Sequence, residues 1–151
     1  MNTATDRSGI EELDFLGSPA RILVDGATAG GAYCLVETSA SRGDMPPLHV
    51  HHADDEAFYI LEGRMTLFVG ELTIDVPAGS CAFAPRDVPH TYRVESDCAR
   101  WLVTGSPAGF DAFVRDVAAA GSDVTPTELA TISRRRGIEL LGPPGMLPAN
   151  V

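Results

Sequence analysis

The chain has 151 residues, of which 44% are hydrophobic, and its 21 acidic and 11 basic residues give a formal net charge of −10. This length and composition are typical of one soluble domain with a sizeable core. The negative charge argues against nucleic acid and against anionic membrane surfaces as partners. No apolar run approaches the roughly 20 residues that a membrane-spanning helix needs.

The N-terminal segment, residues 1–12, is polar and lacks the basic start and apolar run of a signal peptide. We therefore expect a flexible arm here. The three cysteines, Cys34, Cys81 and Cys98, are odd in number and widely spaced. This pattern is typical of reduced thiols, so we expect a cytoplasmic protein without a disulfide framework.

Residues 13–105 predict an all-β domain. Short apolar or alternating runs are interrupted by Gly, Pro, Asp or Ser every eight to twelve residues, which is the spacing of a β-sandwich or barrel. Glu62-Gly63 and Gly70-Glu71 are compact turns, consistent with consecutive hairpins. The predicted strands are Ala20–Asp25, Ala32–Thr38, Glu56–Leu61, Arg64–Val69, Leu72–Val76, Ser80–Ala84, His90–Val94 and Arg100–Gly105.

Residues 106–151 predict a helical extension of this domain. The hydrophobic period changes to about 3.6 after Pro107, which indicates an amphipathic helix over residues 108–120. A second helix is predicted over residues 126–136, because Thr125 can cap it and Glu128 can complete a capping box. We expect the tail from Ile138 to Val151 to be irregular.

All four histidines fall in two short stretches of the chain, and a cluster of imidazoles with a carboxylate is a ligand set for a divalent transition metal. His49 and His51 are two residues apart, so on a strand both imidazoles face the same side. His52 then faces the other side, where we expect a surface residue or one that supports the ligands from outside. Glu56 opens the next strand. The fourth imidazole, His90, begins a later predicted strand.

Strand alternation also suggests which apolar residues face inward with these groups. Such residues either form the core or line an apolar pocket. The candidates for the substrate pocket are Phe58, Ile60, Met65, Leu67, Phe83 and Tyr92.

The histidine stretches resemble the two sequence motifs of the cupin family. In the first, Gly43 is followed after five residues by His49-x-His51, after four more by Glu56, and after six more by Gly63. In the second, Gly79 is followed after five residues by Pro85 and then by His90. Asp87 stands where the family has a second glycine, so the turn before His90 is expected to differ. Val94 stands where the family has an asparagine.

The resemblance implies a double-stranded β-helix, the jelly-roll barrel, with a metal at one end of a cavity. Transferred position by position, the ligands are His49, His51, Glu56 and His90. Three imidazoles and one carboxylate suit Fe(II), Mn(II), Ni(II), Co(II) or Zn(II). Related barrels commonly pair through their sheets, so the resemblance also implies a homodimer.

The stretch from His49 to Tyr59, together with the two C-terminal helices, is similar to small bacterial cupins of the quercetinase-like group. The resemblance implies a metal-dependent dioxygenase that acts on an enolisable aromatic or phenolic small molecule. Glu56 would be both a ligand and the general base on the substrate hydroxyl. One alternative is a non-redox cyclase or isomerase of aromatic polyketide biosynthesis. Another is a metal-containing module that only binds a small molecule.

Overall fold

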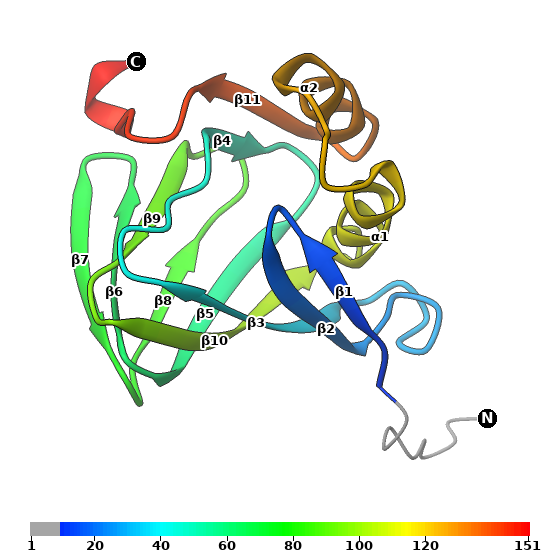
Figure 1. The fold of residues 1–151 in the computed structure, drawn as a ribbon, viewed down its shortest axis with the longest axis horizontal. Coiled ribbons are helices and arrows are strands. Elements are labelled where there is room, and N and C mark those ends of the chain that lie inside the picture. The colour runs from blue at the N-terminus through cyan, green and yellow to red at the C-terminus, as the bar shows by residue number, and fades with distance from the viewer. Residues whose placement is uncertain (1–9) are drawn as a thin grey trace.

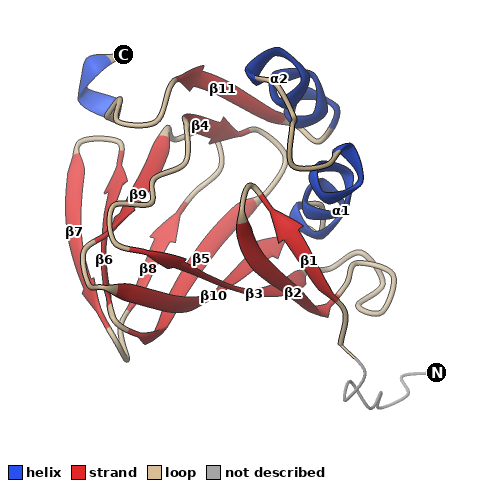
Figure 2. Cartoon of the chain, viewed as in Figure 1, coloured by secondary structure: helices blue, strands red, loops and turns tan. Residues whose placement is uncertain are grey.

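The computed structural model describes residues 10–151 and shows two antiparallel β-sheets that face each other as a jelly-roll barrel (Figure 1). The predicted fold class is therefore confirmed. Two helices and the last strand lie against one end of the barrel, as the colouring by secondary structure makes clear (Figure 2). Among residues 10–151, no helix is long and apolar enough to cross a membrane.

The larger sheet has six strands and the smaller sheet has five. The order of the larger is β1 (Glu12–Phe15), β2 (Ser18–Val24), β3 (Cys34–Ser41), β10 (Cys98–Ser106), β5 (Asp55–Glu62) and β8 (Cys81–Ala84). The order of the smaller is β11 (Ile138–Gly142), β4 (Leu48–His51), β9 (His90–Val94), β6 (Arg64–Val69) and β7 (Leu72–Pro77).

The main core fills the space between the two sheets, because the strands alternate apolar inward and polar outward residues. Strand β10 shows this clearly, since Ala99, Trp101 and Val103 are buried while the residues between them are partly exposed. Trp101, Ile60, Met65 and Leu67 are among the largest fully buried side chains.

A second core lies outside the barrel, between the helices α1 (Phe110–Ala120) and α2 (Pro126–Arg135) and the strand β11. Its buried members are Phe113, Val117, Leu129, Ile132 and Ile138. Both predicted helices are confirmed, and α2 begins with the expected capping box. Thr125 accepts from the Glu128 amide, and the Glu128 carboxylate accepts from the Thr125 amide. A short 3₁₀ helix, η1 (Pro148–Asn150), follows near the C-terminus.

Each of the eight predicted strands corresponds to an observed strand, but the chain forms further strands that the sequence did not indicate. Glu12 begins β1, although the expected arm of residues 1–12 included it, and residues 1–9 of that arm lie outside the described residues. The prediction of an irregular tail from Ile138 is wrong. Ile138 and Leu140 flank the exposed Glu139 and pair β11 with β4, opposite His51 and His49.

The turn before His90 has a backbone conformation typical of glycine, although Asp87 stands at that position. Asp87 lies at φ 64, in the left-handed region that favours glycine and that aspartate tolerates better than most residues. Its amide donates to the His51 carbonyl, which joins this turn to the end of β4. Gly63, in contrast, has φ 82, and a Cβ there would overlap the Cys98 carbonyl, so this position needs glycine.

Candidate metal centre

Four side chains converge from both sheets at the end of the barrel nearest the helices. They are His49, His51, Glu56 and His90, and one potential ligand atom from each lies within 4.8 Å of those of the others. His51, Glu56 and His90 are almost completely buried, at 2%, 2% and 1% exposure, whereas His49 is partly accessible. The group is therefore enclosed by the barrel and open mainly on the side of His49.

Strand register explains why these residues meet. His49 and His51 are two apart on β4, and His49 lies directly opposite His90 on β9. Glu56 comes from β5 in the facing sheet, between Ala84 and Gly105 on the neighbouring strands. The small neighbours on both sides leave the carboxylate free to reach across the barrel.

Each of the three imidazoles is held through its Nδ1 atom. His49 Nδ1 donates to the Pro47 carbonyl at 2.7 Å, and His90 Nδ1 donates to the Val88 carbonyl at 3.1 Å. His51 Nδ1 donates to the buried carboxylate Asp54 Oδ1 at 2.9 Å. A carbonyl or carboxylate can only accept, so all three hydrogen bonds place a proton on Nδ1 and leave Nε2 for the centre.

The Nε2 atoms converge on Glu56. Its Oε2 atom lies 2.9 Å from His90 Nε2 and 3.3 Å from His51 Nε2. Burial alone would raise the pKa of Glu56, but His51 and His90 outweigh it and lower that pKa to about 2. The carboxylate is therefore ionised at neutral pH.

The histidines are affected unequally by the same surroundings. Burial and the neighbouring His90 and His51 lower the pKa of His49 to about 3, so its imidazole is neutral. Burial opposes protonation of His51 as well, but the carboxylates of Glu56 and Asp54 outweigh it and raise the pKa of His51. A cation among these atoms would take the place of the proton at His51.

This donor set fits a divalent transition metal. Three imidazole nitrogens with fixed tautomers and one ionised carboxylate oxygen point at a common centre, and each imidazole has an acceptor behind it. Without such an ion, the single atom Glu56 Oε2 is the partner of both His51 Nε2 and His90 Nε2. The predicted group of His49, His51, Glu56 and His90 is therefore brought together by the fold and could hold one metal ion.

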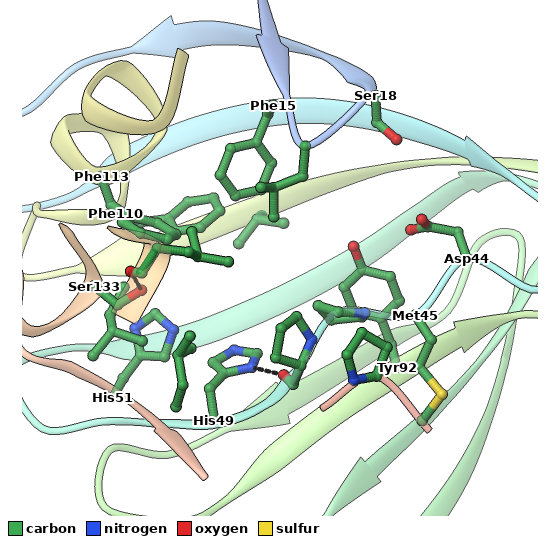
Figure 3. A pocket seen from close by; sticks show the side chains of 18 of the residues that line it. Phe15, Ser18, Asp44, Met45, His49, His51, Tyr92, Phe110, Phe113 and Ser133 are labelled. Atoms are coloured by element: carbon green, nitrogen blue, oxygen red, sulfur yellow. Dashed lines mark hydrogen bonds between the residues drawn. The ribbon is translucent and has the colours of Figure 1, made fainter. Parts of the chain in front are cut away.

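A cavity of about 690 Å³ is lined by three of the four residues, His49, His51 and Glu56, and lies within the size range of small-molecule sites. Figure 3 shows His49 and His51 on one side of it and the rings of Phe15, Phe110 and Phe113 on the opposite side. These three rings make edge and tilted contacts at 5.7–6.1 Å. The wall is mainly apolar, and among the described residues that line the cavity there is no arginine or lysine.

The prediction for the substrate pocket needs correction. Phe58 and Tyr92 line the cavity, but Ile60, Met65 and Leu67 belong to the fully buried core between the sheets. Phe83 is 56% exposed, because the alternation of β8 turns Ala82 and Ala84 inward. The prediction placed Phe83 inside, but the register of β8 gives the inward positions to the small alanines.

The structure also identifies residues that the sequence did not reveal. Asp54 is 4% exposed and orients His51, a role indicated only by its position three residues after that histidine. The cover of the cavity comes from the extension, where Phe110, Leu129 and Leu140 line it. Their periodicity predicted buried faces but not the surface that those faces cover.

His52 points away from the centre, in agreement with its predicted outward orientation. Its side chain is about half exposed, with Nδ1 2.7 Å from Asp87 Oδ1 and Nε2 2.9 Å from Glu139 Oε2. It therefore connects the end of β4, the turn before β9 and the strand β11 on the outer surface.

Comparison with known proteins is consistent with this fold and this site. A family model of the cupin domain matches residues 36–105, a range that includes all four residues of the centre. The chain is also 28% identical over 95 residues to quercetin 2,3-dioxygenase from Bacillus subtilis. That match covers 63% of this chain but only 28% of the Bacillus protein, so the likeness concerns one part of a much longer chain.

Solved structures show the same barrel. An RmlC-like cupin from Shewanella frigidimarina superposes with a TM-score of 0.61 at 21% identity, covering 74% of this chain and 99% of that one. The polyketide cyclase RemF from Streptomyces resistomycificus gives 0.56 at 24% identity, covering 70% and 80%. Jelly-roll topology, the match over residues 36–105 and these likenesses agree, and the family model identifies residues 36–105 as a cupin domain.

Proposed function

We propose that the protein is a metal-dependent enzyme, a quercetinase-like dioxygenase of an enolisable aromatic or phenolic small molecule. His49, His51, Glu56 and His90 bind one divalent transition metal. The observation that carries the proposal is the position of this set beside a mainly apolar cavity of about 690 Å³. The partial likeness to quercetin 2,3-dioxygenase supports the choice of reaction.

The lining of the cavity restricts the substrate. No arginine or lysine among the described residues reaches it, so a phosphate or carboxylate on the substrate would find no cationic partner away from the metal. Aromatic and aliphatic side chains cover most of the wall, including Phe15, Phe58 and Phe110. A flat, neutral molecule with a hydroxyl beside a carbonyl fits these conditions.

Bound metal would supply Lewis acidity toward an oxygen of the substrate. The chain supplies the remaining functions. Phe110, which packs against Phe15 and Phe113, excludes water beside His51, and Asp54 holds the orientation of that imidazole. Glu56 lies where it could accept the proton of the substrate hydroxyl.

The two roles of Glu56 make different demands on its pKa. A value of about 2 keeps the carboxylate ionised for a metal but makes it a weak proton acceptor. Replacing Glu56 by Gln keeps the size and one oxygen donor while removing the base. We expect partial loss of metal affinity and a decrease in turnover of roughly 10²–10⁴, the range of a lost general base.

The test uses protein loaded in turn with Fe(II), Mn(II), Ni(II) and Co(II), with 3-hydroxyflavone as substrate. We expect stoichiometric oxygen uptake with at least one metal, and its loss in Glu56→Gln. The matched control is Glu62→Gln on the same strand, where the carboxylate is exposed and pairs with Arg100 at 2.9 Å. Near-normal turnover in metal-loaded Glu56→Gln would show that Glu56 is not the base.

The same metal and base could also promote enolisation without oxygen, so a cyclase or isomerase is the second candidate. A cavity of this volume, covered by two helices, accommodates a folded polycyclic precursor as well as a flavonol. Strict anaerobiosis separates the two: oxygen-independent product formation excludes the dioxygenase and supports the second candidate.

A further inference from the structure

Two polar side chains stand on the side of the cavity away from His51. Figure 3 shows the Asp44 carboxylate there, with the hydroxyl of Tyr92 pointing toward the same region. Both residues line the cavity, and neither belongs to the ligand set. Ser18, Thr38 and Ser133 also contribute hydroxyls to this mainly apolar wall, but Asp44 carries its one carboxylate outside the ligand set.

Neither group has a partner within the described chain. Among residues 10–151, no side chain or backbone amide bonds to the Asp44 carboxylate, and partial burial raises its pKa without an interaction that opposes it. The Tyr92 hydroxyl likewise lacks a hydrogen bond within residues 10–151. Polar groups in an apolar cavity are normally paired, so both are available to a bound molecule.

A continuous aromatic wall connects these groups to the proposed metal site. The ring of Phe58 lies 6.2 Å from His90 and 6.3 Å from Tyr92, and Tyr92 packs edge-on against Trp101 at 5.2 Å. A flat ligand that contacts the histidines at one end can therefore lie along Phe58. Its other end then reaches the region of Asp44 and Tyr92.

The charge of Asp44 determines what this end can recognise. A carboxylate accepts hydrogen bonds and repels anions, and no arginine or lysine in the described lining offsets it. We propose that Asp44, with Tyr92, forms a second recognition site that binds a hydroxyl group on the end of the substrate remote from the metal. This inference rests on the proposed function, because it assumes a flat hydroxyaromatic substrate.

The test compares two ligands that differ by one hydroxyl, 3-hydroxyflavone and 3,4′-dihydroxyflavone. Binding is measured on Zn(II)-loaded protein without oxygen, so that no turnover is needed. Trp101 is the only tryptophan of the chain and lines the cavity, so quenching of its fluorescence reports occupancy. We expect the dihydroxy compound to bind about tenfold to a hundredfold more tightly, the range of a hydrogen bond to a charged group.

In Asp44→Leu this preference should disappear, with unchanged zinc content. Tyr92→Phe keeps the ring contacts and should reduce the preference less. The matched control is Asp97→Leu, because Asp97 is exposed and pairs with Arg42 outside the cavity. If Asp44→Leu fails to fold, Asp44→Asn serves instead and should reduce the preference several-fold.

The outcomes separate this inference from the proposed function. Equal affinity for the two flavonols in the parent protein, or a preference that survives in Asp44→Leu, overturns the second recognition site even if both compounds are oxidised in air. A preference that depends on Asp44 without any oxygen uptake supports this site and refutes the dioxygenase. Failure of both flavonols to bind overturns both.

Discussion

The barrel and the C-terminal extension meet at the same cavity, but they contribute different chemistry to it. The barrel supplies His49, His51, Glu56 and His90, together with the acceptors behind the three imidazoles. The extension supplies a mainly apolar cover, and the hydroxyl of its one polar side chain in the lining, Ser133, donates to the Leu129 carbonyl at 2.7 Å within α2.

Metal binding and exclusion of water are therefore assigned to two separate parts of the chain. Metal binding depends on strands whose register is fixed by the barrel, whereas exclusion of water depends on helices that contribute no potential ligand. Changes in the two regions should therefore have separable effects. Changes in the barrel centre should alter metal content, and changes in the second core should alter stability while the ligand set remains.

The largest effect is expected from the proposed ligands themselves. His51→Ala and His90→Ala should each lose most of the bound metal, because each removes a ligand and disturbs the orientation of the others. Metal per chain, measured by elemental analysis after loading and desalting, tests this. His52→Ala is the control and should retain metal. Full occupancy in both ligand variants would refute the assignment.

A change in the C-terminal extension should lower stability without changing metal content. Ile132 on α2 is 9% exposed and belongs to the second core but not to the cavity lining. Ile132→Ala should lower the free energy of unfolding by about 2–4 kcal/mol, the usual cost of such a truncation, with unchanged metal per folded chain. Urea unfolding measures the first quantity. Thr131→Ala on the exposed side of α2 should stay within about 0.5 kcal/mol.

A smaller effect on metal binding is expected at Asp54, which orients the proposed ligand His51. Asp54→Asn keeps the shape of the side chain but weakens the hold on His51 Nδ1, and metal affinity should fall about 10–100-fold. Competition titration with a chromophoric chelator measures this. Asp111→Asn is a comparison variant, since Asp111 is also buried and accepts from backbone amides but lies in α1. An equal loss in both variants would argue for a general structural effect.

The pH dependence of metal affinity tests the role of Asp54 further. Glu56 and Asp54 raise the pKa of His51, so a proton competes with metal there at a higher pH than for an ordinary histidine. Metal affinity should therefore rise with pH through this raised pKa and then level off. In Asp54→Asn the plateau should begin at lower pH and lie lower. An unshifted profile would show that Asp54 does not act through His51.

The same comparison explains what could be predicted from the sequence. The four residues of the centre depend on strand periodicity and on spacing within two short stretches, and both properties are local. Asp87 shows the limit of that approach, because its departure from the family pattern suggested a different turn, yet its backbone takes the left-handed conformation that glycine favours.

The cavity could not be predicted in the same way, because its wall comes from segments far apart in the chain. Phe15, Phe58, Phe110 and Leu140 reach it from β1, β5, α1 and β11. Ile138 and Leu140 form too short an alternation to indicate a strand, and β11 exists because β4 offers it an unpaired edge. Tertiary pairing of this kind leaves little trace in local sequence.

The smallest effect is expected at His52, where the two regions touch on the outer surface. His52 bonds Asp87 of the barrel and Glu139 of the extension, and these hydrogen bonds raise its pKa. All three side chains are about half exposed or more, so solvent screens their interaction. His52→Gln should therefore destabilise the protein far less than Ile132→Ala, without loss of metal.

The contribution of His52 to stability depends on pH, and the direction of its pKa shift gives the sign of that dependence. A group with a raised pKa in the folded state stabilises that state below its unfolded pKa, and the contribution disappears as pH rises through the folded value. The difference between parent and His52→Gln in urea midpoint should therefore be larger near pH 6 than near pH 9, with chelator present to remove metal-linked protons. Since Glu139 belongs to β11, Glu139→Gln should reproduce part of this dependence. A difference that stays the same across this pH range would mean that His52 acts at this junction through packing rather than through its charge.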